Sequence, residues 1–262
     1  MTNSNNTYAY ENARLYSDYS EKYTEHHTVI AEEIAKVANI KKNDRILEIG
    51  VGTGASTKVF LSYLGKKGVL DGIDISTNML YFFRKNIKSN KVGKIINGDA
   101  KDIEKYFLEY KYDKILCGNS FWCIHDLNRF LLGASKLLKS NGRLIFSIYG
   151  TRIISYDIEK IEKLFKRVNI KYIEDESRIL FLKRTEEAKM KFNEIFKKKN
   201  KERFVILGPL NRMIMKLRNL LWRLKFRRAI AIWGSEEFKN IRRIKESKAH
   251  TVPVMIYSAK LL

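Results

Sequence analysis

Three glycines spaced two residues apart are the part of this sequence best suited to binding a ligand. Gly50, Gly52 and Gly54 lie in the segment ILEIGVGTGAST at 46–57, where an apolar run predicts a strand and the residues after the glycines predict a helix. Glycine lets a backbone turn tightly and approach a ligand closely, and the free N–H groups at the start of a helix attract polar ligands. The segment therefore indicates a nucleotide-binding turn, with close packing of strand against helix as the alternative.

Two carboxylates accompany this glycine turn. Glu48 lies at the end of the predicted strand, where it could accept hydrogen bonds or pair with a cation. Asp74 follows Gly54 by 20 residues and ends a second apolar run, where a carboxylate could accept both ribose hydroxyls of a nucleotide. A dinucleotide is disfavoured, because its fingerprint G-x-G-x-x-G does not space the glycines evenly.

Alternating strands and helices must hold these residues in place. The expected strands are 45–49, 68–75, 94–97, 114–117 and 143–149, and the expected helices are 26–38, 56–64, a segment from 76 or 77 onward, and 127–138. Strands joined by helices pair in parallel and bind ligands beyond their carboxyl ends. One or two strands in 170–182 and a last strand at 252–262 would complete the sheet. The sequence thus predicts an α/β fold with a doubly wound, mostly parallel, seven-stranded sheet.

Positive charge is concentrated in the second part of the chain. The 262 residues have a net charge of +22, with 22 basic and 16 acidic residues in 1–150 but 29 and 13 in 151–262. Further helices are expected at 157–168, 186–198 and 209–228, the last with apolar residues repeating at three and four. We therefore expect residues 1–183 plus 251–262 to form the core, and 184–250 to form a basic helical insertion before the last strand that caps the substrate.

Composition excludes several classes of protein. With 45% hydrophobic and 31% charged residues, the chain has the composition of a folded globular protein. The two cysteines, Cys117 and Cys123, and the four histidines do not have metal-ligand spacing, so neither a disulfide scaffold nor a metal site is expected. Because the sequence has no apolar leader and no run of about 18 apolar residues, we expect a cytoplasmic protein without a transmembrane segment.

Several segments in a fixed order carry a resemblance to a known family. They are YENARLY at 10–16, ILEIGVGTG at 46–54, GIDIS at 72–76, INGDA at 96–100, YDKILCGNSFWCIHDL at 112–127 and LLKSNGRLIFSIYG at 137–150. Together they resemble the class I S-adenosylmethionine-dependent methyltransferases, particularly the group of quinone-biosynthesis and small-molecule enzymes. The terminal VPVMIYSAK is similar to the last antiparallel strand of that fold. The resemblance covers about the first 150 residues well.

The resemblance implies that the cofactor is S-adenosylmethionine and gives each cofactor residue a role. Gly50, Gly52 and Gly54 would line its methionine part, Glu48 would lie near its amino group, Asp74 would hold the ribose, Ile75 would pack on adenine, Asp99 and Ala100 would meet the adenine edge, and Tyr16 would close over the cofactor. An Asx turn is the alternative for Asp99. A packing or surface position is the alternative for Tyr16.

The segment after the fourth expected strand contains the candidates for catalysis. It departs from the relatives, which often have histidine, tryptophan and proline where this chain has Trp122, Cys123 and His125. Asn119 could orient the amino-acid end of the cofactor or the substrate, and an asparagine satisfied within its own turn is the alternative. His125 is the candidate general base, although a lone histidine is more often structural. No neighbour in the sequence would activate Cys123 as a nucleophile.

Three functions remain open at this stage. The first is methyl transfer to an O, N or C atom of a small-molecule or lipid-like acceptor. The second is an RNA methyltransferase whose basic C-terminal region binds nucleic acid, which the regular apolar spacing and few aromatics of 210–224 make less favoured. The third is a cofactor-binding fold without turnover. The helix expected at 209–228 would also suit peripheral contact with an anionic membrane, with packing on its own protein as the alternative.

Overall fold

The computed structural model of the chain describes residues 17, 25–149, 165–168, 170–172, 178–183 and 251–261. Tyr16, most of the expected helix at 157–168, the expected helices at 186–198 and 209–228, and the basic insertion at 184–250 lie outside the described residues. In the described part, residues 165–167 are helical. No helix among the described residues is long and apolar enough to cross a membrane.

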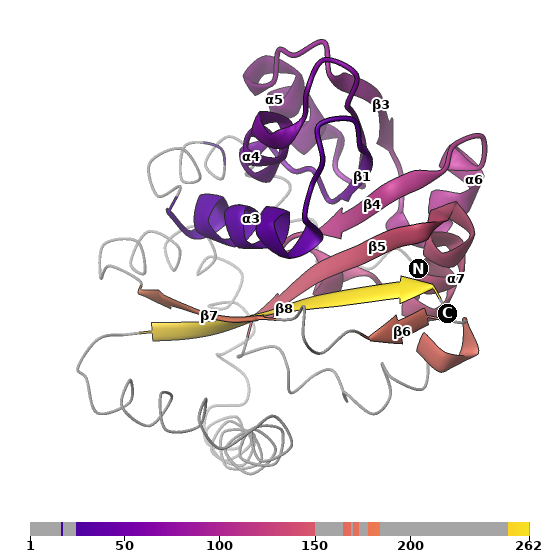
Figure 1. Cartoon of the computed structure of the whole chain (residues 1–262). Coiled ribbons are helices and arrows are strands. Elements are labelled where there is room, and N and C mark those ends of the chain that lie inside the picture. The colour runs from indigo at the N-terminus through magenta and orange to yellow at the C-terminus, as the bar shows by residue number, and fades with distance from the viewer. Residues whose placement is uncertain are drawn as a thin grey trace, which may run out of the picture.

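One sheet forms the centre of the fold (Figure 1). Its strands are β1 (Arg45–Ile49), β2 (Val69–Asp74), β3 (Val92–Asn97), β4 (Tyr112–Cys117), β5 (Leu138–Tyr149), β6 (Ile170–Tyr172), β7 (Arg178–Lys183) and β8 (Thr251–Leu261). The order is β3-β2-β1-β4-β5-β8-β6, with β7 also paired to β8. Strands β1 to β5 pair in parallel, and β8 is antiparallel to β5, β6 and β7. The expected α/β class and mostly parallel sheet are confirmed.

The expected count of seven strands is wrong, because eight strands are described. β6 pairs with the carboxyl end of β8, where Ile170 lies opposite Leu261. β7 pairs with the amino half of β8, where Lys183 lies opposite Thr251. The two short strands therefore share one neighbour, and of the one or two strands considered for 170–182, two are present.

Helices cover the sheet on both faces. They are α3 (Glu25–Ala38), α4 (Ala55–Tyr63), α5 (Thr77–Asn86), α6 (Ile103–Phe107) and α7 (Leu127–Leu137), with the short 3-10 helices η1 (Ala100–Asp102) and η2 (Phe121–Cys123). One apolar cluster joins α3 and α4 to the sheet, and a second joins α6 and α7 to it. In β1, Ile46 belongs to the first cluster and its neighbour Leu47 to the second, because successive residues of a strand point to opposite faces. Burial on both faces explains why Ile46 and Leu47 can both be apolar, without the alternation of apolar and polar residues that a half-exposed strand shows.

The β5 strand begins earlier than the sequence suggests. Asn141 and Gly142 predict a turn before a strand at 143–149, but β5 starts at Leu138 directly after α7. Its register against β4 shifts between the pairs Tyr112↔Leu138 and Lys114↔Arg143. A Cβ at Gly142 would lie 2.9 Å from the Lys139 carbonyl oxygen and 3.0 Å from that of Tyr112, so glycine permits this irregularity inside the strand.

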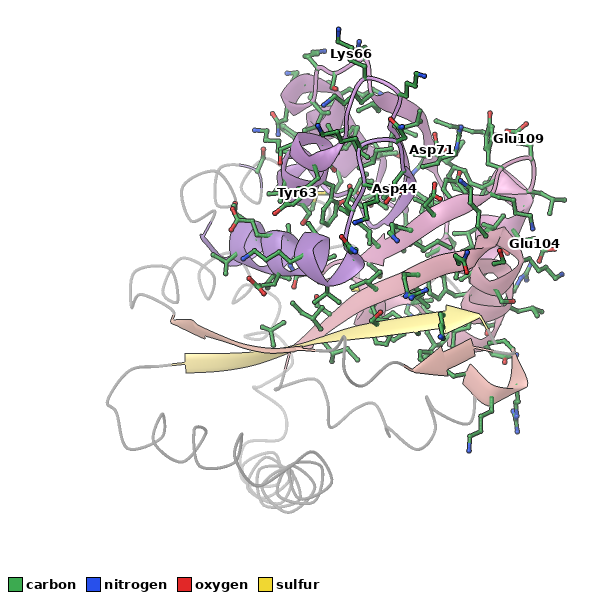
Figure 2. The ribbon with its side chains drawn as sticks, in the orientation of Figure 1. Asp44, Tyr63, Lys66, Asp71, Glu104 and Glu109 are labelled. Carbon is green, nitrogen blue, oxygen red and sulfur yellow. The ribbon has the colours of Figure 1, made fainter. Side chains whose placement is uncertain are left out.

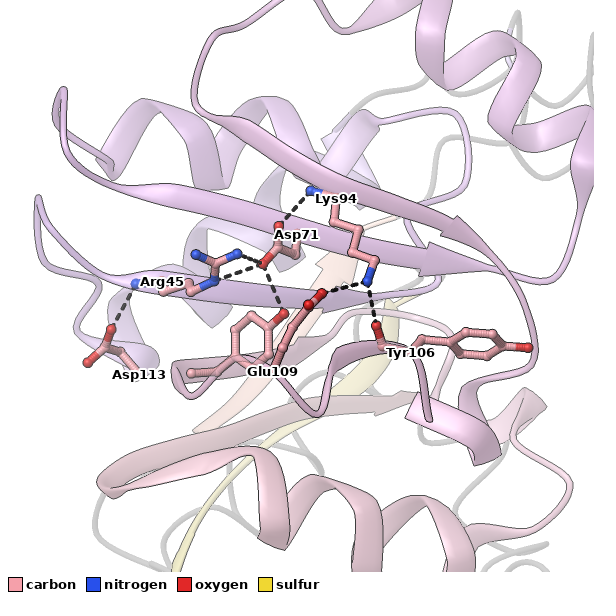
Figure 3. Close-up of polar contacts among 7 residues, drawn as sticks. Arg45, Asp71, Lys94, Tyr106, Glu109 and Asp113 are labelled. Carbon is pink, nitrogen blue, oxygen red and sulfur yellow. Dashed lines mark hydrogen bonds and ion pairs between the residues drawn. The ribbon is translucent and has the colours of Figure 1, made fainter. Parts of the chain in front are cut away.

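A buried ion network ties the strands together in the amino-terminal half of the sheet (Figure 3). The fully buried Asp71 of β2 accepts hydrogen bonds from Arg45 Nε at 2.9 Å and Nη2 at 2.6 Å, from Tyr112 OH at 2.9 Å and from Lys94 N at 2.6 Å. Burial and the nearby charge of Asp71 raise the pKa of Tyr112, which keeps its hydroxyl a donor. Asp71 lies within the sheet, whereas Glu109 lies on the outside of the fold (Figure 2). This network is structural, because all four donors belong to strands that it joins.

Candidate functional site

The glycine turn follows β1 and leads directly into α4. Gly50, Gly52 and Gly54 have φ values of 73°, 55° and 95°, a left-handed conformation that other residues adopt only with strain. A Cβ at Gly50 would lie 2.6 Å from the Ser120 side chain, and one at Gly54 would lie 2.5 Å from Ile87, so packing requires glycine at both places. Among the residues that the structure describes, a Cβ at Gly52 would meet nothing within 4 Å. The space beside the turn therefore opens at Gly52.

Asp74 connects this turn to the start of α5. Its Oδ2 accepts a hydrogen bond from Gly52 N at 2.8 Å, and its Oδ1 accepts one from Ser76 N at 2.9 Å. The side chain is 7% exposed, and burial raises the pKa of Asp74 although both hydrogen bonds oppose that shift. Each carboxylate oxygen can accept a second hydrogen bond. Asp74 is therefore able to bind a pair of hydroxyls at the edge of the turn.

Glu48 lies beneath the same turn and is almost fully buried. Thr57 Oγ1 of α4 donates a hydrogen bond of 2.6 Å to its Oε2. Burial raises the pKa of Glu48 to about 8; the hydrogen bond from Thr57 opposes this shift, and the charge of Asp74 adds to it. A cation beside this carboxyl group would stabilise its ionised form, because an opposite charge favours ionisation.

The residues after β2 and β3 form the next part of this edge. Ile75 follows β2 directly and is 53% exposed, so its apolar side chain offers an uncovered surface. Asp99 begins η1, where its Oδ1 accepts a hydrogen bond from Lys101 N at 3.0 Å and its Oδ2 pairs with Lys101 Nζ at 3.0 Å. The Asx-type turn considered for Asp99 is therefore present. Ala100 is partly buried and packs against the cluster beneath α6 and α7.

The charges around Asp99 include the histidine proposed as a general base. Burial alone would raise the pKa of Asp99, but the hydrogen bonds and charge of Lys101, together with His125, hold that pKa below its ordinary value. His125 itself is exposed and lies between η2 and α7. The structure therefore places His125 within electrostatic reach of the predicted adenine edge.

Asn119 occupies a different part of the site, after the end of β4. It has a φ of 61°, a left-handed conformation that asparagine tolerates better than most residues. Its backbone N donates to Ser147 Oγ of β5 at 2.9 Å, and its Oδ1 accepts from that hydroxyl at 3.4 Å. Its Nδ2 lies 3.3 Å from Nδ1 of His27 in α3. The amide thus joins β4, β5 and α3, in contrast to the simple turn asparagine that the sequence left open.

Three side chains in this region had not been identified from the sequence. Ser120 donates from Oγ to the Ile49 carbonyl oxygen at 2.7 Å, which closes the end of β4 against the glycine turn. His27 and Ser147 hold Asn119. Ser120 and Ser147 lie in the segments 112–127 and 137–150, but no spacing within those segments singles them out. His27 lies in none of the quoted segments and is 92 residues from Asn119, so only the fold brings them together.

Cys117 and Cys123 differ in their surroundings. Cys117 is buried and Cys123 is partly buried. Burial raises the pKa of Cys117 to about 12, and its Sγ lies 3.2 Å from Ser120 Oγ. A thiol held in its protonated form is a poor nucleophile, so Cys117 is a packing residue.

The structure joins part of the predicted site by direct contact. Asp74 binds Gly52, and its charge acts on Glu48. Tyr16 lies outside the described residues, but Asn86 Nδ2 of α5 donates to the Thr53 carbonyl oxygen at 3.0 Å and to Ser17 Oγ at 3.3 Å. The residue after Tyr16 is thereby linked to the glycine turn through Asn86.

A known protein family matches most of the chain that builds this site. A family model described as a methyltransferase domain matches residues 40–200, which is more than half of the chain. The chain belongs to the class I S-adenosylmethionine-dependent methyltransferases. This methyltransferase therefore has S-adenosylmethionine as its cofactor.

Curated relatives of this methyltransferase match only part of its length. A demethylmenaquinone methyltransferase of Staphylococcus aureus is 26% identical over 140 residues, which cover 50% of this chain and 57% of the relative. A malonyl-(acyl-carrier protein) O-methyltransferase of Priestia megaterium is 31% identical over 105 residues, which cover 40% of this chain and 36% of the relative. The matched part of this methyltransferase thus spans less than two thirds of each relative.

A solved structure supports the fold. The YcgJ protein of Bacillus subtilis matches with a TM-score of 0.53 and 14% identity, over 90% of this chain and 98% of that one. This likeness concerns the fold alone.

The residues of the methyltransferase site fit its cofactor. Gly52 leaves open space where a ligand could lie against the backbone. Asp74 offers acceptors for the two ribose hydroxyls, and Ile75 offers an exposed apolar surface for a flat ring. The buried carboxyl group of Glu48 is suited to the cationic amino group. These features lie at the carboxyl ends of β1 and β2, where an open parallel sheet binds its ligand.

Proposed function

We propose that this methyltransferase transfers the methyl group of S-adenosylmethionine to an O, N or C atom of a small-molecule or lipid-like acceptor. The observation that carries the proposal is the opening at Gly52, bordered by the carboxylate of Asp74. The names of two relatives, a demethylmenaquinone methyltransferase and a malonyl-(acyl-carrier protein) O-methyltransferase, support an acceptor of this class.

In this proposal the glycine turn and the two strand ends hold the cofactor. The turn formed by Gly50, Gly52 and Gly54 lines its methionine part, which approaches the backbone at Gly52, and Glu48 lies near its amino group. Asp74 orients the ribose, and Ile75 packs on the adenine. Asp99 and Ala100 face the adenine edge, where the ion pair of Asp99 with Lys101 keeps the carboxylate ionised and able to accept a hydrogen bond.

Positioning does most of the catalysis that we propose. When bound, the cofactor supplies a methyl group on a positively charged sulfur, which is already activated for displacement. The chain must then align the acceptor and exclude water. Asn119 is suited to orienting a polar group, because Ser147 and His27 fix its amide from two sides. His125 is proposed as the base for an acceptor that must lose a proton.

The region that selects the acceptor is proposed to be the basic insertion at 184–250, as a cap over the core formed by 1–183 and 251–262. The cofactor motifs all precede residue 150, whereas residues 151–262 hold 29 of the 51 Lys and Arg residues. The same charge supports the second candidate function, an RNA methyltransferase. Nucleic acid that co-purifies with the protein and is released by salt would favour that candidate.

Calorimetric titration and a transfer assay test the proposal. We expect the purified protein to bind S-adenosylmethionine and S-adenosylhomocysteine at micromolar level. With cofactor labelled in its methyl group, we expect label to appear in a quinone-like or acyl-thioester acceptor and not in RNA. Saturable binding of NAD without binding of S-adenosylmethionine would contradict the cofactor site. Transfer of label to RNA alone would contradict the proposed acceptor.

A further inference from the structure

Asn97 ends β3 and makes three hydrogen bonds with the segment that follows β2. Its Nδ2 donates to the Asp74 and Ile75 carbonyl oxygens, each at 3.0 Å. Its Oδ1 accepts from Thr77 Oγ1 at 3.0 Å. The side-chain amide thus forms hydrogen bonds through both of its N–H donors and through its oxygen. Its partners lie 20 to 23 residues earlier in the sequence.

The segment that Asn97 holds lies between two regular elements. β2 ends at Asp74 and α5 begins at Thr77, so Ile75 belongs neither to the strand nor to the helix. Its side chain is 53% exposed, so core packing does not fix its position. The bond from Asn97 fixes its carbonyl group instead. The Asp74 carbonyl oxygen is held twice, since Gly98 N also donates to it at 3.0 Å.

The side chain of Asn97 is not part of the core. Asn97 is exposed, and it belongs to no apolar cluster among the described residues. Removing its side chain would therefore leave no core cavity. What would be lost is the side-chain bond to the Ile75 carbonyl oxygen and one of the two bonds to that of Asp74, which Gly98 N would still hold.

We propose that Asn97 is a positioning residue for the adenosine half of the cofactor. By holding the carbonyl groups of Asp74 and Ile75, it fixes the carboxylate that binds the ribose and the apolar side chain that packs on adenine. This inference rests on the proposed cofactor site. It adds Asn97, which does not contact the cofactor itself and acts through Asp74 and Ile75, the two residues proposed to contact it.

Titration of full-length protein with S-adenosylhomocysteine and with adenosine, well below the unfolding temperature, tests this role. We expect Asn97→Ala to weaken binding of both ligands by a similar factor, roughly 3- to 30-fold, because both contain the adenine and the ribose. Thr77→Val is the matched control. It removes the bond to Asn97 Oδ1 but leaves both carbonyl bonds, so we expect less than half of that loss on a logarithmic scale.

A double-mutant cycle with Ile75→Ala separates positioning from a general loss of stability. If Asn97 acts through Ile75, Asn97→Ala should cost less affinity in the Ile75→Ala background than in the wild type. Equal losses in both backgrounds would overturn the proposal, and so would S-adenosylhomocysteine affinity within twofold of wild type in folded Asn97→Ala. If Asn97→Ala does not fold, Asn97→Asp serves in both tests, because it keeps the size but cannot donate to the carbonyls. A wild type that fails to bind S-adenosylhomocysteine would instead refute the cofactor site itself.

Discussion

Gly52 differs from its two neighbouring glycines in what surrounds it. All three have positive φ, but Ser120 fills the space at Gly50 and Ile87 fills it at Gly54. The sequence could not distinguish them, because these two contacts come from segments far along the chain. Packing explains glycine at two of the positions, whereas at Gly52 the described residues leave the space open, as the proposed ligand site requires.

Enlarging Gly52 should block the cofactor. Gly52→Ala and Gly52→Leu both place a side chain at φ 55°, which costs about 1–2 kcal/mol of folding stability. Only leucine fills the open space, so we expect Gly52→Leu to bind S-adenosylhomocysteine at least about tenfold more weakly than Gly52→Ala, a difference of ~1.4 kcal/mol. Calorimetry on both folded variants measures this difference. Equal affinities would mean that the cofactor does not lie against Gly52.

Glu48 should make stability depend on pH. Burial raises its pKa from 4.5 to about 8, so the folded protein binds this proton more tightly than the unfolded chain does. The unfolding free energy should therefore fall as pH rises from about 4.5 to about 8, and level off above that range. Glu48→Gln cannot ionise and is the control. In urea denaturation at pH 5, 6.5 and 8, the wild type should lose stability relative to Glu48→Gln at each step, and a constant difference would contradict the prediction.

At the scale of the element, β2 carries two buried carboxylates with different tasks. Asp71 accepts from Arg45, Tyr112 and Lys94 in the amino-terminal half of the sheet, whereas Asp74 accepts from Gly52 at the edge proposed to bind the cofactor. A parallel sheet that binds ligands at its carboxyl end explains this division.

Asp71→Asn should destabilise the fold and leave the cofactor site intact. The change would leave the Arg45 guanidinium without its carboxylate, and breaking a buried pair in this way costs about 3–5 kcal/mol. Lys94→Met, which removes the exposed pair with Glu109 and the hydrogen bond to the Tyr106 carbonyl oxygen, should cost less, about 1–2 kcal/mol. Chemical denaturation gives both values. S-adenosylhomocysteine affinity of the folded Asp71→Asn protein should match the wild type, and a large loss of affinity would show that the network also shapes the cofactor edge.

The sequence predicted β1, β2, α3 and α7 to within one residue at each end. β1 has the expected bounds, Arg45–Ile49, and β2 at Val69–Asp74 lies within the expected 68–75. It predicted β5 less well, because the turn signal of Asn141 and Gly142 is local, whereas the pairing Tyr112↔Leu138 depends on a distant strand. The hydrogen-bond partners of Asp71 could not be predicted from the sequence either, because they lie 23 to 41 residues away in it.

At the scale of the whole molecule, the doubly wound sheet explains why one edge collects the site. The residues after β1, β2, β3 and β4 include Gly52, Ile75, Asp99 and Asn119, and parallel pairing brings these strand ends to the same side. The order of the strands and helices along the sequence was sufficient to predict that these residues lie at the same edge of the sheet. The contact of Asn119 with His27 was not predictable, because it depends on how α3 packs on the sheet.

The basic insertion is where the acceptor should be selected, and charge reversal tests it in the full-length protein. Arg223 and Arg227 lie on the predicted basic face of 209–228, and each Arg near an anionic membrane contributes about 1 kcal/mol of binding. The double variant Arg223→Glu, Arg227→Glu should therefore bind anionic vesicles at low salt at least about 30-fold more weakly, as measured by co-sedimentation, and should turn over acceptor more slowly. Neutral vesicles and raised salt are the controls, and S-adenosylhomocysteine affinity should stay unchanged. If the wild type ignores anionic vesicles and the double variant turns over acceptor normally, the charged face has no part in function and 209–228 serves only in packing.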